Sequence, residues 1–547
     1  MLTESMEIDG ILIGLRQEAH YWRAQHARAI EREVAWRNRA RQLEDTVGSQ
    51  QRRIAELAQQ VEERDARIAW LEQQVFGPKS EQTQGSVPEM PANEAQTSDS
   101  GQGSLEEPRR RGQQAGAKGH GRKHRHQLRT EVVVHDLPEE QRRCPHCGKP
   151  LVAFPGTEDS DEIDWQMDVL RRIHRRTRYR PNCDCQAVPG IVTAPGPVKL
   201  IPKGLFSIGF WVQVLLEKFL FQRPLYRVRK VLALEGLDVS QGTLTGGLKW
   251  IGRLVQPVYA YILERNRSAT HWQMDETRWL VFVKVEGKKG YQWWLWVVVT
   301  RDTVAYLLDP RRSADVPRNH LGPDAVGIIN ADRYKVYQVL GLKILVAFCW
   351  SHVRRDFIRV QDGYKPLAQW AESWIARINE LFALNARRVS VLSDPAAFQV
   401  GDQAVRAAVE TMARQRDQEL ADPHLHQAAR KALESLRRHW TGCILFVDHP
   451  EIPMDNNESE RRLRDPAVGR KNYYGSGSVW SGMLTAMLFT LFQTLIKNHL
   501  DPKKWLQAYF EACAHNGGRP PENIEAFLPW NLSAEQKDAW SLGKPFT

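Results

Sequence analysis

The stretch from residue 271 to residue 350 constrains the fold more than any other part of this chain, because it holds short apolar runs separated by turn signals. Runs rich in Val, Leu, Trp and Tyr between such signals are typical of β-strands. The predicted strands are His271–Val285, Tyr291–Thr300, Val304–Asp309, Ala325–Asn330 and Leu342–Trp350, and a helix is predicted at Arg312–Leu321. Three strands, a helix, and then strand, helix and strand is the order of a ribonuclease-H-like fold, whose mixed sheet carries acids at strand ends.

Two aspartates in this block point to metal chemistry. Asp275 lies inside the first predicted strand, and Asp332 lies just past the fourth. If those strands are neighbours, both carboxylates reach the same ion. Oxygen ligands suit Mg²⁺ or Mn²⁺, and two such ions about 4 Å apart promote an in-line displacement at phosphorus. A single aspartate at a strand end is more often a turn or cap residue, so this interpretation requires a third acid.

The third acid is supplied by the segment from Asp455 to Arg464. Asp455 or a neighbour is predicted to cap a helix, and Glu460 falls within its first turns, where a carboxylate can face the sheet. Spacing alone does not exclude a swap between Glu458 and Glu460. The local competitors are Glu276, Glu458 and Asp465. The predicted catalytic and metal-binding residues are Asp275, Asp332 and Glu460, with two Mg²⁺ or Mn²⁺ ions.

A long stretch separates Asp332 from Glu460, and it is too long for a direct connection. Apolar residues recur in it at helical spacing, as at Leu367, Trp370, Trp374, Ile378 and Leu381. We predict a mostly helical insertion and assign these tryptophans to core packing in preference to bracing DNA.

The N-terminal region carries a heptad repeat. One seam position holds Val47, Ile54, Val61, Ile68 and Val75, and the other holds Leu43, Leu57 and Leu71. Such a repeat is typical of a coiled coil, although Gln50 and Arg64 interrupt the second position. Because the remaining surface is almost wholly charged or Gln, we favour self-association over an amphipathic helix packed on a globular core.

The charge distribution favours a polyanionic partner. The net charge is +11 with a pI near 9.3, and a linker from Thr83 to Glu107 without Lys or Arg precedes a strongly basic arm. An arm of this kind can follow a phosphate backbone or enter a minor groove; a solvated linker is the alternative. The arm residues predicted to bind DNA are Arg109, Arg110, Arg111, Lys118, Arg122 and Lys123.

Four of the seven cysteines are clustered, which indicates a metal site rather than a disulfide framework. Cys144 and Cys147 form a knuckle that places two thiolates on one tetrahedral ion, and Cys183 and Cys185 complete four sulfur ligands. The tighter spacing of the second pair leaves His146 as a substitute ligand. We predict a structural Zn²⁺ ion.

A helix pair is predicted between these regions. Leu225–Ala233 forms the first helix, a turn containing Gly236 follows, and Ser240 caps a second helix through Leu244, Leu248 and Ile251. Helix, turn and helix is the shape of a DNA-reading pair, and ordinary helical packing is its competitor.

The chain resembles the transposases of insertion sequence family sixty-six, a family with an Asp-Asp-Glu (DDE) triad. The matching pieces are Phe76-Gly77-Pro78-Lys79-Ser80-Glu81, the Cys144 knuckle, Pro224-Leu225-Tyr226, Met274-Asp275-Glu276-Thr277, Ala331-Asp332-Arg333-Tyr334, Cys349-Trp350-Ser351-His352-Val353-Arg354-Arg355, Asp455-Asn456-Asn457 with Glu460-Arg461, and Gly469-Arg470-Lys471-Asn472. The resemblance implies that Asp275, Asp332 and Glu460 are the triad, and so favours Glu460 over Glu458. It also implies small accessory proteins of the same element as partners. The family usually has Gly where this chain has Arg333.

Side chains around the triad are further candidates. His352 is expected near the acids as an assisting or phosphate-contacting residue, while Cys349 and Trp350 are assigned to packing. Basic residues near the glutamate are natural phosphate contacts, with a solvated basic face as the alternative. These residues are Arg461, Arg464, Arg470 and Lys471.

The predicted protein is a multidomain α+β chain that binds the terminal inverted repeats of an insertion sequence, cleaves strands and transfers them to target DNA. The alternatives are a non-catalytic oligomeric DNA-binding regulator and a ribonuclease-H-like nuclease. The longest apolar block, Trp293 to Val299, is far short of the roughly 20 residues of a membrane span, so a cytoplasmic protein is expected. The predicted segments are a coiled-coil region at 1–82, a linker and basic arm at 83–130, a zinc module at 131–200, a helix-turn-helix region at 201–268, the two parts of the catalytic domain at 269–355 and 451–547, and the helical insertion at 356–450.

Overall fold

The computed structural model describes residues 2–76, 169–179, 192–284, 290–340 and 343–543. The basic-arm residues from Arg109 to Lys123 and the four cysteines predicted to bind zinc, Cys144, Cys147, Cys183 and Cys185, lie outside these ranges. The described part is a mixed α+β structure, in which helices surround one six-stranded sheet and a two-stranded sheet joins β1 (Arg178–Tyr179) to β2 (Val192–Thr193).

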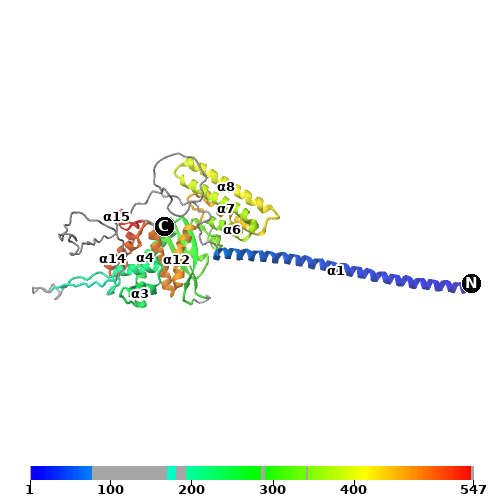
Figure 1. The fold of residues 1–547 in the computed structure, drawn as a ribbon, viewed down its shortest axis with the longest axis horizontal. Helices are drawn as coiled ribbons and strands as arrows, with labels where there is room; N and C mark the ends of the chain where they lie inside the picture. Colours follow the sequence, from blue (N-terminus) through cyan, green and yellow to red (C-terminus); the bar gives the residue numbers. More distant parts are fainter. Residues whose placement is uncertain (1, 77–168, 180–191, 285–289, 341–342, 544–547) are drawn as a thin grey trace, which may run out of the picture. The chain divides into compact units, whose positions relative to one another are not determined.

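The N-terminal region is a single continuous helix, α1 (Leu2–Phe76), coloured blue in Figure 1. The heptad repeat lies within it. The seam side chains of Val47, Ile54 and Val61 are about half or more exposed within this chain. The helix therefore carries an apolar stripe along a largely polar surface.

The main sheet has the strand order β5-β4-β3-β6-β7. The first three strands in sequence, β3 (His271–Val281), β4 (Gln292–Val299) and β5 (Val304–Asp309), form an antiparallel meander. The next two, β6 (Gly327–Ala331) and β7 (Ile344–Phe348), are parallel to β3. A short strand, β8 (Gly475–Ser476), also pairs with β3. The sheet is mixed because its second half is reached by crossovers, whereas hairpins build the first half.

Gly327 illustrates how closely the parallel strands begin. It has φ of 154°, and a Cβ atom there would collide with the carbonyl oxygen of Thr270. Only glycine allows β6 to start against the segment that leads into β3.

The predicted strands are all present, but only the limits of β5 agree with the prediction, and the differences are largest at β3 and β7. The predicted first strand ran to residue 285, whereas β3 ends at Val281, where pairing with β4 has already stopped. β7 is shorter than predicted at both ends, and the helix expected before it is a single 3-10 turn, η3 (Tyr337–Val339). The predictions for β3 and β7 were too long because the apolar residues continue beyond the positions at which a neighbouring strand provides backbone hydrogen-bond partners. α5 (Asp315–Leu321) begins three residues later than predicted.

α13 (Val479–Lys497) covers the free edge of β5. Thr494 Oγ1 accepts the backbone N–H of Val304 at 3.1 Å, and Thr490 Oγ1 accepts that of Tyr306 at 2.8 Å. These bonds satisfy edge donors that the sheet leaves open. By length and apolar composition α13 is the one candidate membrane span among the described helices, but two thirds of its apolar window is buried, so we interpret it as a core helix.

The helices before the sheet pack with α13 in the largest core cluster. They are α2 (Ile208–Leu215), the π-helix η2 (Leu216–Leu220), α3 (Leu225–Leu234) and α4 (Gln241–Arg267). Ser240 caps α4 as predicted, since its hydroxyl accepts the N–H of Thr243 at 3.0 Å. The buried side of α4 includes Leu244, Leu248 and Ile251.

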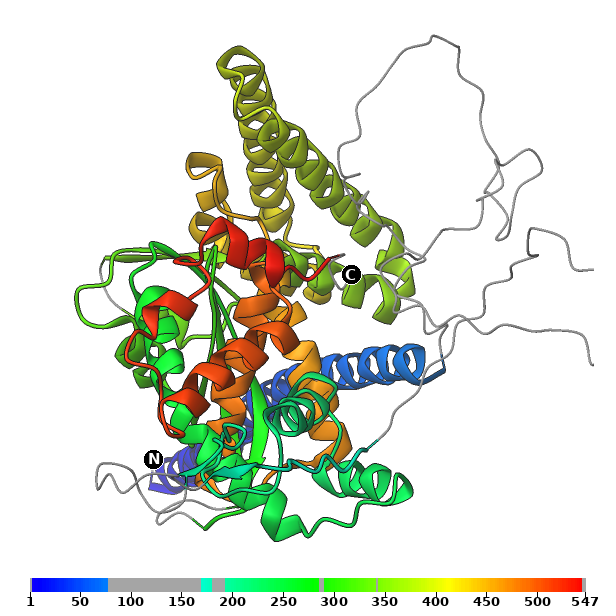
Figure 2. The same ribbon diagram turned by 90° about the vertical axis from the view of Figure 1, so that its left-hand side faces the viewer.

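The stretch predicted to be a helical insertion is helical, and Figure 2 shows its long helices in yellow-green. Its helices are α6 (Trp350–Gly363), α7 (Ala368–Ser390), α8 (Pro395–Ala421), α9 (Gln427–Arg438), α10 (Trp440–Cys443) and α11 (Leu445–Asp448), with a 3-10 turn η4 (Lys365–Leu367). They enclose a second core in which Trp374 is fully buried. The assignment of Trp374 to packing is therefore confirmed.

The chain then returns to the sheet. α12 (Asn457–Tyr473) packs on β3 and β4, and it is followed by α13, α14 (Pro502–His515), the 3-10 turn η5 (Glu525–Phe527) and α15 (Ala534–Ala539). These C-terminal helices are coloured orange to red in Figure 2. Segments far apart in sequence, before and after the insertion, thus complete one core around the sheet.

Candidate active site

Asp275 and Asp332 lie at corresponding positions on adjacent strands. β3 and β6 are parallel, with Gln273 opposite Asn330. Two residues further along each chain come Asp275 and Asp332. Asp275 lies near the middle of β3 and Asp332 directly after β6, and the parallel register brings the two residues to the same level of the sheet.

Local hydrogen bonds orient both aspartates. Asp275 Oδ1 accepts the backbone N–H of Glu276 at 2.8 Å. Asp332 Oδ1 accepts the backbone N–H of Tyr334 at 3.0 Å, which closes a tight turn directly after β6.

Glu460 reaches the same region from the first turns of α12. Its Oε1 lies 3.6 Å from Nδ1 of His352, in the first turn of α6. Its negative charge also acts on Asp275, as does that of Asp332. The structure therefore brings the three predicted acids and His352 together.

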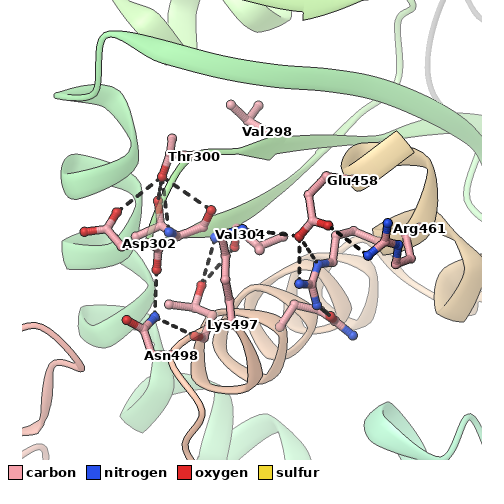
Figure 3. A network of polar contacts seen from close by, with 12 residues as sticks. Val298, Thr300, Asp302, Val304, Glu458, Arg461, Lys497 and Asn498 are labelled. Carbon is pink, nitrogen blue, oxygen red and sulfur yellow. Dashed lines mark hydrogen bonds and ion pairs between the residues drawn. The ribbon is translucent and has the colours of Figure 1, made fainter. Parts of the chain in front are cut away.

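Glu458, the alternative to Glu460, is held elsewhere. Its Oε1 accepts hydrogen bonds from Arg462 at 2.8 Å and Lys497 at 3.2 Å, and Arg461 lies 3.5 Å from its other oxygen. Figure 3 shows this carboxylate with Arg461 and Lys497. Burial raises the pKa of Glu458, but the hydrogen bond and charge of Arg462, with Lys497, outweigh burial and lower it overall. Glu458 is thus an ion-pair partner of α13.

The acids create a strongly negative, poorly solvated site. Burial, the charge of Glu276, and then those of Asp332 and Glu460 raise the pKa of Asp275 to about 8. Like charges at short range disfavour simultaneous ionisation unless a cation offsets them. In addition, Glu460 Oε1 is buried and has no hydrogen-bond partner. An all-oxygen set with an unpartnered buried oxygen suits a hard divalent cation.

Glu276, a further alternative, is already engaged. Its Oε1 accepts from Arg312 Nε at 2.7 Å and its Oε2 accepts from Tyr337 at 2.5 Å. The Arg312 guanidinium also lies over the rings of Trp294 and Tyr334. This network fixes the strand that carries Asp275 and leaves Glu276 without a free oxygen. Asp465 accepts a hydrogen bond from Gln493 on α13.

Two asparagines that sequence reasoning missed position the glutamate helix. Asn456 Nδ2 donates to the carbonyl oxygen of Met274 at 2.7 Å, and Asn330 Nδ2 donates to that of Pro453 at 2.7 Å. Both asparagines are buried. They connect the segment before α12 to β3 and β6 at the residues next to the aspartates. The Asp455-Asn456-Asn457 motif was the sequence signal for Asn456.

Arg333 does not point into the acid site. Its guanidinium donates to Asp356 at 2.5 Å, to Ser435 at 2.8 Å and to the carbonyl oxygen of His352 at 3.2 Å. It therefore connects the turn after β6 to α6 and α9. Arg333, at the position where the family usually has glycine, therefore adds hydrogen bonds between this turn and the helical insertion.

Cys349 and His352 lie at the start of α6. Cys349 is fully buried, as the packing assignment predicted, and burial raises the pKa of its thiol to about 11. Its sulfur accepts the backbone N–H of Asn456 at 3.2 Å. Burial lowers the pKa of His352, against the opposing influence of Glu460. His352 Nδ1 is buried without a hydrogen-bond partner.

The four basic residues of α12 that were predicted to contact phosphates divide into two groups. Arg461, Arg464 and Lys471 are exposed. Arg470 is half-buried and donates to Thr277 Oγ1 at 3.1 Å and to the carbonyl oxygen of Arg278 at 2.7 Å. Arg470 therefore holds α12 on β3, whereas the other three side chains face solvent.

Comparison with known proteins places the chain in a family. The family model described as "Transposase IS66 family" matches residues 203–484, which include both aspartates and the glutamate. The uncharacterized protein y4jD of Sinorhizobium fredii (strain NBRC 101917 / NGR234) is 27% identical over 88% of this chain and 97% of its own length. The uncharacterized protein y4qI of the same strain is 28% identical over 75% of this chain and 77% of its own length. No solved structure matches. On the strength of the family match, this chain belongs to the IS66 family of transposases.

Proposed function

We propose that this protein binds the terminal inverted repeats of an insertion sequence, cleaves DNA strands and joins the freed 3′-hydroxyls to target DNA. The observation that carries this proposal is the convergence of Asp275, Asp332 and Glu460 within a chain of a transposase family. The sheet order β5-β4-β3-β6-β7, an antiparallel meander followed by two parallel strands, supports the ribonuclease-H-like interpretation.

The three acids are proposed to hold two Mg²⁺ or Mn²⁺ ions. When bound, such ions activate the attacking oxygen and stabilise the leaving oxygen of an in-line displacement. The protein's own part is to keep the carboxylates in place: Asn456 and Asn330 hold the α12 segment against the strands, and the Glu276–Arg312 pair braces β3. His352 beside Glu460 is proposed to assist by contacting the phosphate.

DNA recognition is proposed to use several surfaces. Arg461, Arg464 and Lys471 are exposed next to the glutamate and can contact phosphates. The α3–α4 pair is proposed as the helix-turn-helix element, since one face of α4 is buried while Gln241, Gly242 and Thr243 at its start are exposed. The arm from Arg109 to Lys123 and a structural Zn²⁺ ion on Cys144, Cys147, Cys183 and Cys185 remain proposals from sequence.

Assembly is proposed to occur through α1. A stripe of exposed Val, Leu and Ile at heptad spacing is buried when two or more copies associate. Dependence on small accessory proteins of the same element is proposed from the family alone.

The test is a strand-cleavage and strand-transfer assay with the full chain, labelled element ends and Mg²⁺ or Mn²⁺. Asp275→Asn, Asp332→Asn and Glu460→Gln are each expected to reduce the rate roughly a thousandfold, about 4 kcal/mol of barrier. Glu458→Gln is the matched control, because it makes the same chemical change two residues away, and its rate is expected to stay within about tenfold.

The assay also separates the alternatives. Cleavage without joining would favour a nuclease. Binding of element ends without cleavage by any variant, even when accessory proteins of the element are supplied, would favour a regulator. Full activity in Asp275→Asn would exclude the triad.

A further inference from the structure

A second group of ligand atoms lies beside the carboxylate site. One ligand atom each from Cys349, His352 and Glu460 lies within 4.8 Å of the other two. Cys349 occupies the N-cap position of α6 and His352 follows three residues later, so both side chains lie on the same face of that helix end. Glu460 approaches from α12.

Two of these atoms have no hydrogen-bond partner. His352 Nδ1 and Glu460 Oε1 are both buried and neither has a hydrogen bond. Their separation of 3.6 Å is too long for a hydrogen bond between them. Buried polar atoms in proteins are almost always satisfied by protein, water or an ion. Two unsatisfied atoms that face each other therefore point to a ligand shared between them.

The donor types identify the ligand. Sulfur and imidazole nitrogen are ligands of Zn²⁺ and similar ions and are not ligands of Mg²⁺. Ligand atoms about 2.0 Å from a tetrahedral Zn²⁺ ion lie about 3.3 Å apart, and the 3.6 Å between His352 Nδ1 and Glu460 Oε1 is close to that spacing. We propose that Cys349, His352 and Glu460 bind a thiophilic divalent transition-metal ion of the Zn²⁺ class.

The ligand atoms of this group are buried, although two of the side chains that carry them are partly exposed. The side chains of His352 and Glu460 are 26% and 31% exposed, whereas Cys349 is fully buried. As the metal–sulfur bond forms, the thiol proton passes to solvent, and the N–H of Asn456 already donates to that sulfur and stabilises the thiolate. Three protein ligands leave the fourth position for water.

Glu460 belongs to both sites, which has a functional consequence. An ion held by Cys349, His352 and Glu460 withdraws this carboxylate from the Mg²⁺ ions that the triad is proposed to hold. Zn²⁺ therefore inhibits strand cleavage by competing for Glu460. This inhibition rests on the proposed function, whereas the existence of the metal site does not.

The direct test titrates the metal-free full chain with Co²⁺, a spectroscopic probe for Zn²⁺ sites. Cys349→Ser is expected to bind one Co²⁺ ion fewer per chain than wild type and to lose part of the thiolate-to-cobalt charge-transfer absorption. Cys443→Ser is the matched control, because Cys443 is also buried and lies outside the group, so it should behave as wild type. The difference in bound Co²⁺ between wild type and each variant excludes Co²⁺ that is bound by the other cysteines, because those cysteines are the same in both proteins.

His352→Gln, at a partly exposed position, guards against misfolding of the cysteine variant and should also lose one ion. Equal Co²⁺ stoichiometry and equal spectra in wild type, Cys349→Ser and His352→Gln would overturn the proposal. Loss of one ion in both variants, with wild-type behaviour of Cys443→Ser, supports it.

A second measurement separates this inference from the proposed function. The Zn²⁺ concentration that halves the Mg²⁺-dependent cleavage rate is measured for each active variant and compared with the wild-type value. Cys349→Ser should require at least about tenfold more Zn²⁺ than wild type, since loss of a ligand weakens the site. If no variant cleaves DNA, the proposed function fails, and the Co²⁺ titration still decides whether the site exists.

Discussion

Asn456 Nδ2 donates a 2.7 Å hydrogen bond to the carbonyl oxygen of Met274, the residue before Asp275. This bond joins the start of the glutamate helix to the strand that carries the first aspartate, although the two residues are far apart in sequence. The distance between Glu460 and Asp275 therefore depends on a buried amide that does not itself belong to the triad.

Asn456→Ala is expected to lower DNA cleavage by about a hundredfold and to lower the free energy of unfolding by about 1–3 kcal/mol, because it leaves a buried carbonyl oxygen without its donor. Asn457→Ala is the control, since Asn457 is exposed and its side-chain amide donates to the neighbouring Asp455. Rates from the cleavage assay and urea denaturation check both effects. Equal losses in the two variants would contradict the positioning role.

Arg333 and Asp356 are expected to be energetically coupled. Both side chains are mostly buried, and their 2.5 Å contact joins the turn after Asp332 to α6. Arg333→Ala should reduce stability by about 2 kcal/mol. A double-mutant cycle with Asp356→Ala should give a coupling energy of about 1–2 kcal/mol. Arg359, half exposed at 3.4 Å from the same carboxylate, should give a value under about 1 kcal/mol; similar coupling for both arginines would show that Arg333 has no special role.

His320 should contribute to loss of stability in acid. It is buried against Asn266, and burial followed by the charge of Arg267 lowers its pKa to about 4. The unfolded chain takes up a proton on this residue near pH 6.5 and the folded protein does not, so stability falls as pH drops from about 6.5 to about 4.

Between pH 7 and pH 5, wild type should therefore lose about 2 kcal/mol more stability than His320→Gln. Urea denaturation at the two pH values measures this difference. His424→Gln, which removes an exposed histidine, should keep the wild-type pH dependence. An unchanged acid response in His320→Gln would show that the pKa of this residue does not differ between the folded and unfolded states.

The heptad stripe on α1 should set the oligomeric state. Val47→Glu with Ile54→Glu places two charges at seam positions, whereas Ser49→Glu with Ala55→Glu adds the same charge away from the seam. Charges at seam positions must be desolvated when helices associate. Light scattering after size exclusion is expected to show a smaller species for the first pair alone. The same mass for both pairs and wild type would mean that α1 does not mediate assembly.

The elements that were predicted well are those with purely local causes. The limits of β5 agree with the predicted Val304–Asp309, and Ser240 caps α4. Both features depend only on residues that are close together in the sequence. The helical spacing around Trp374 likewise depends only on a periodicity of a few residues. The ends of β3 and β7 were missed because pairing depends on partners elsewhere in the chain.

The sequence by itself determined which acids were available, the helix or strand that carries each one, and the family to which the chain is similar. Only the tertiary structure decided that Glu458 is paired with Arg462 and Lys497 while Glu460 turns toward His352, that Arg333 points to the insertion, and that Asn456 joins α12 to β3. The local sequence pattern predicts which helix or strand carries a side chain. The partner of that side chain depends on which surfaces come into contact after segments distant in sequence have packed together.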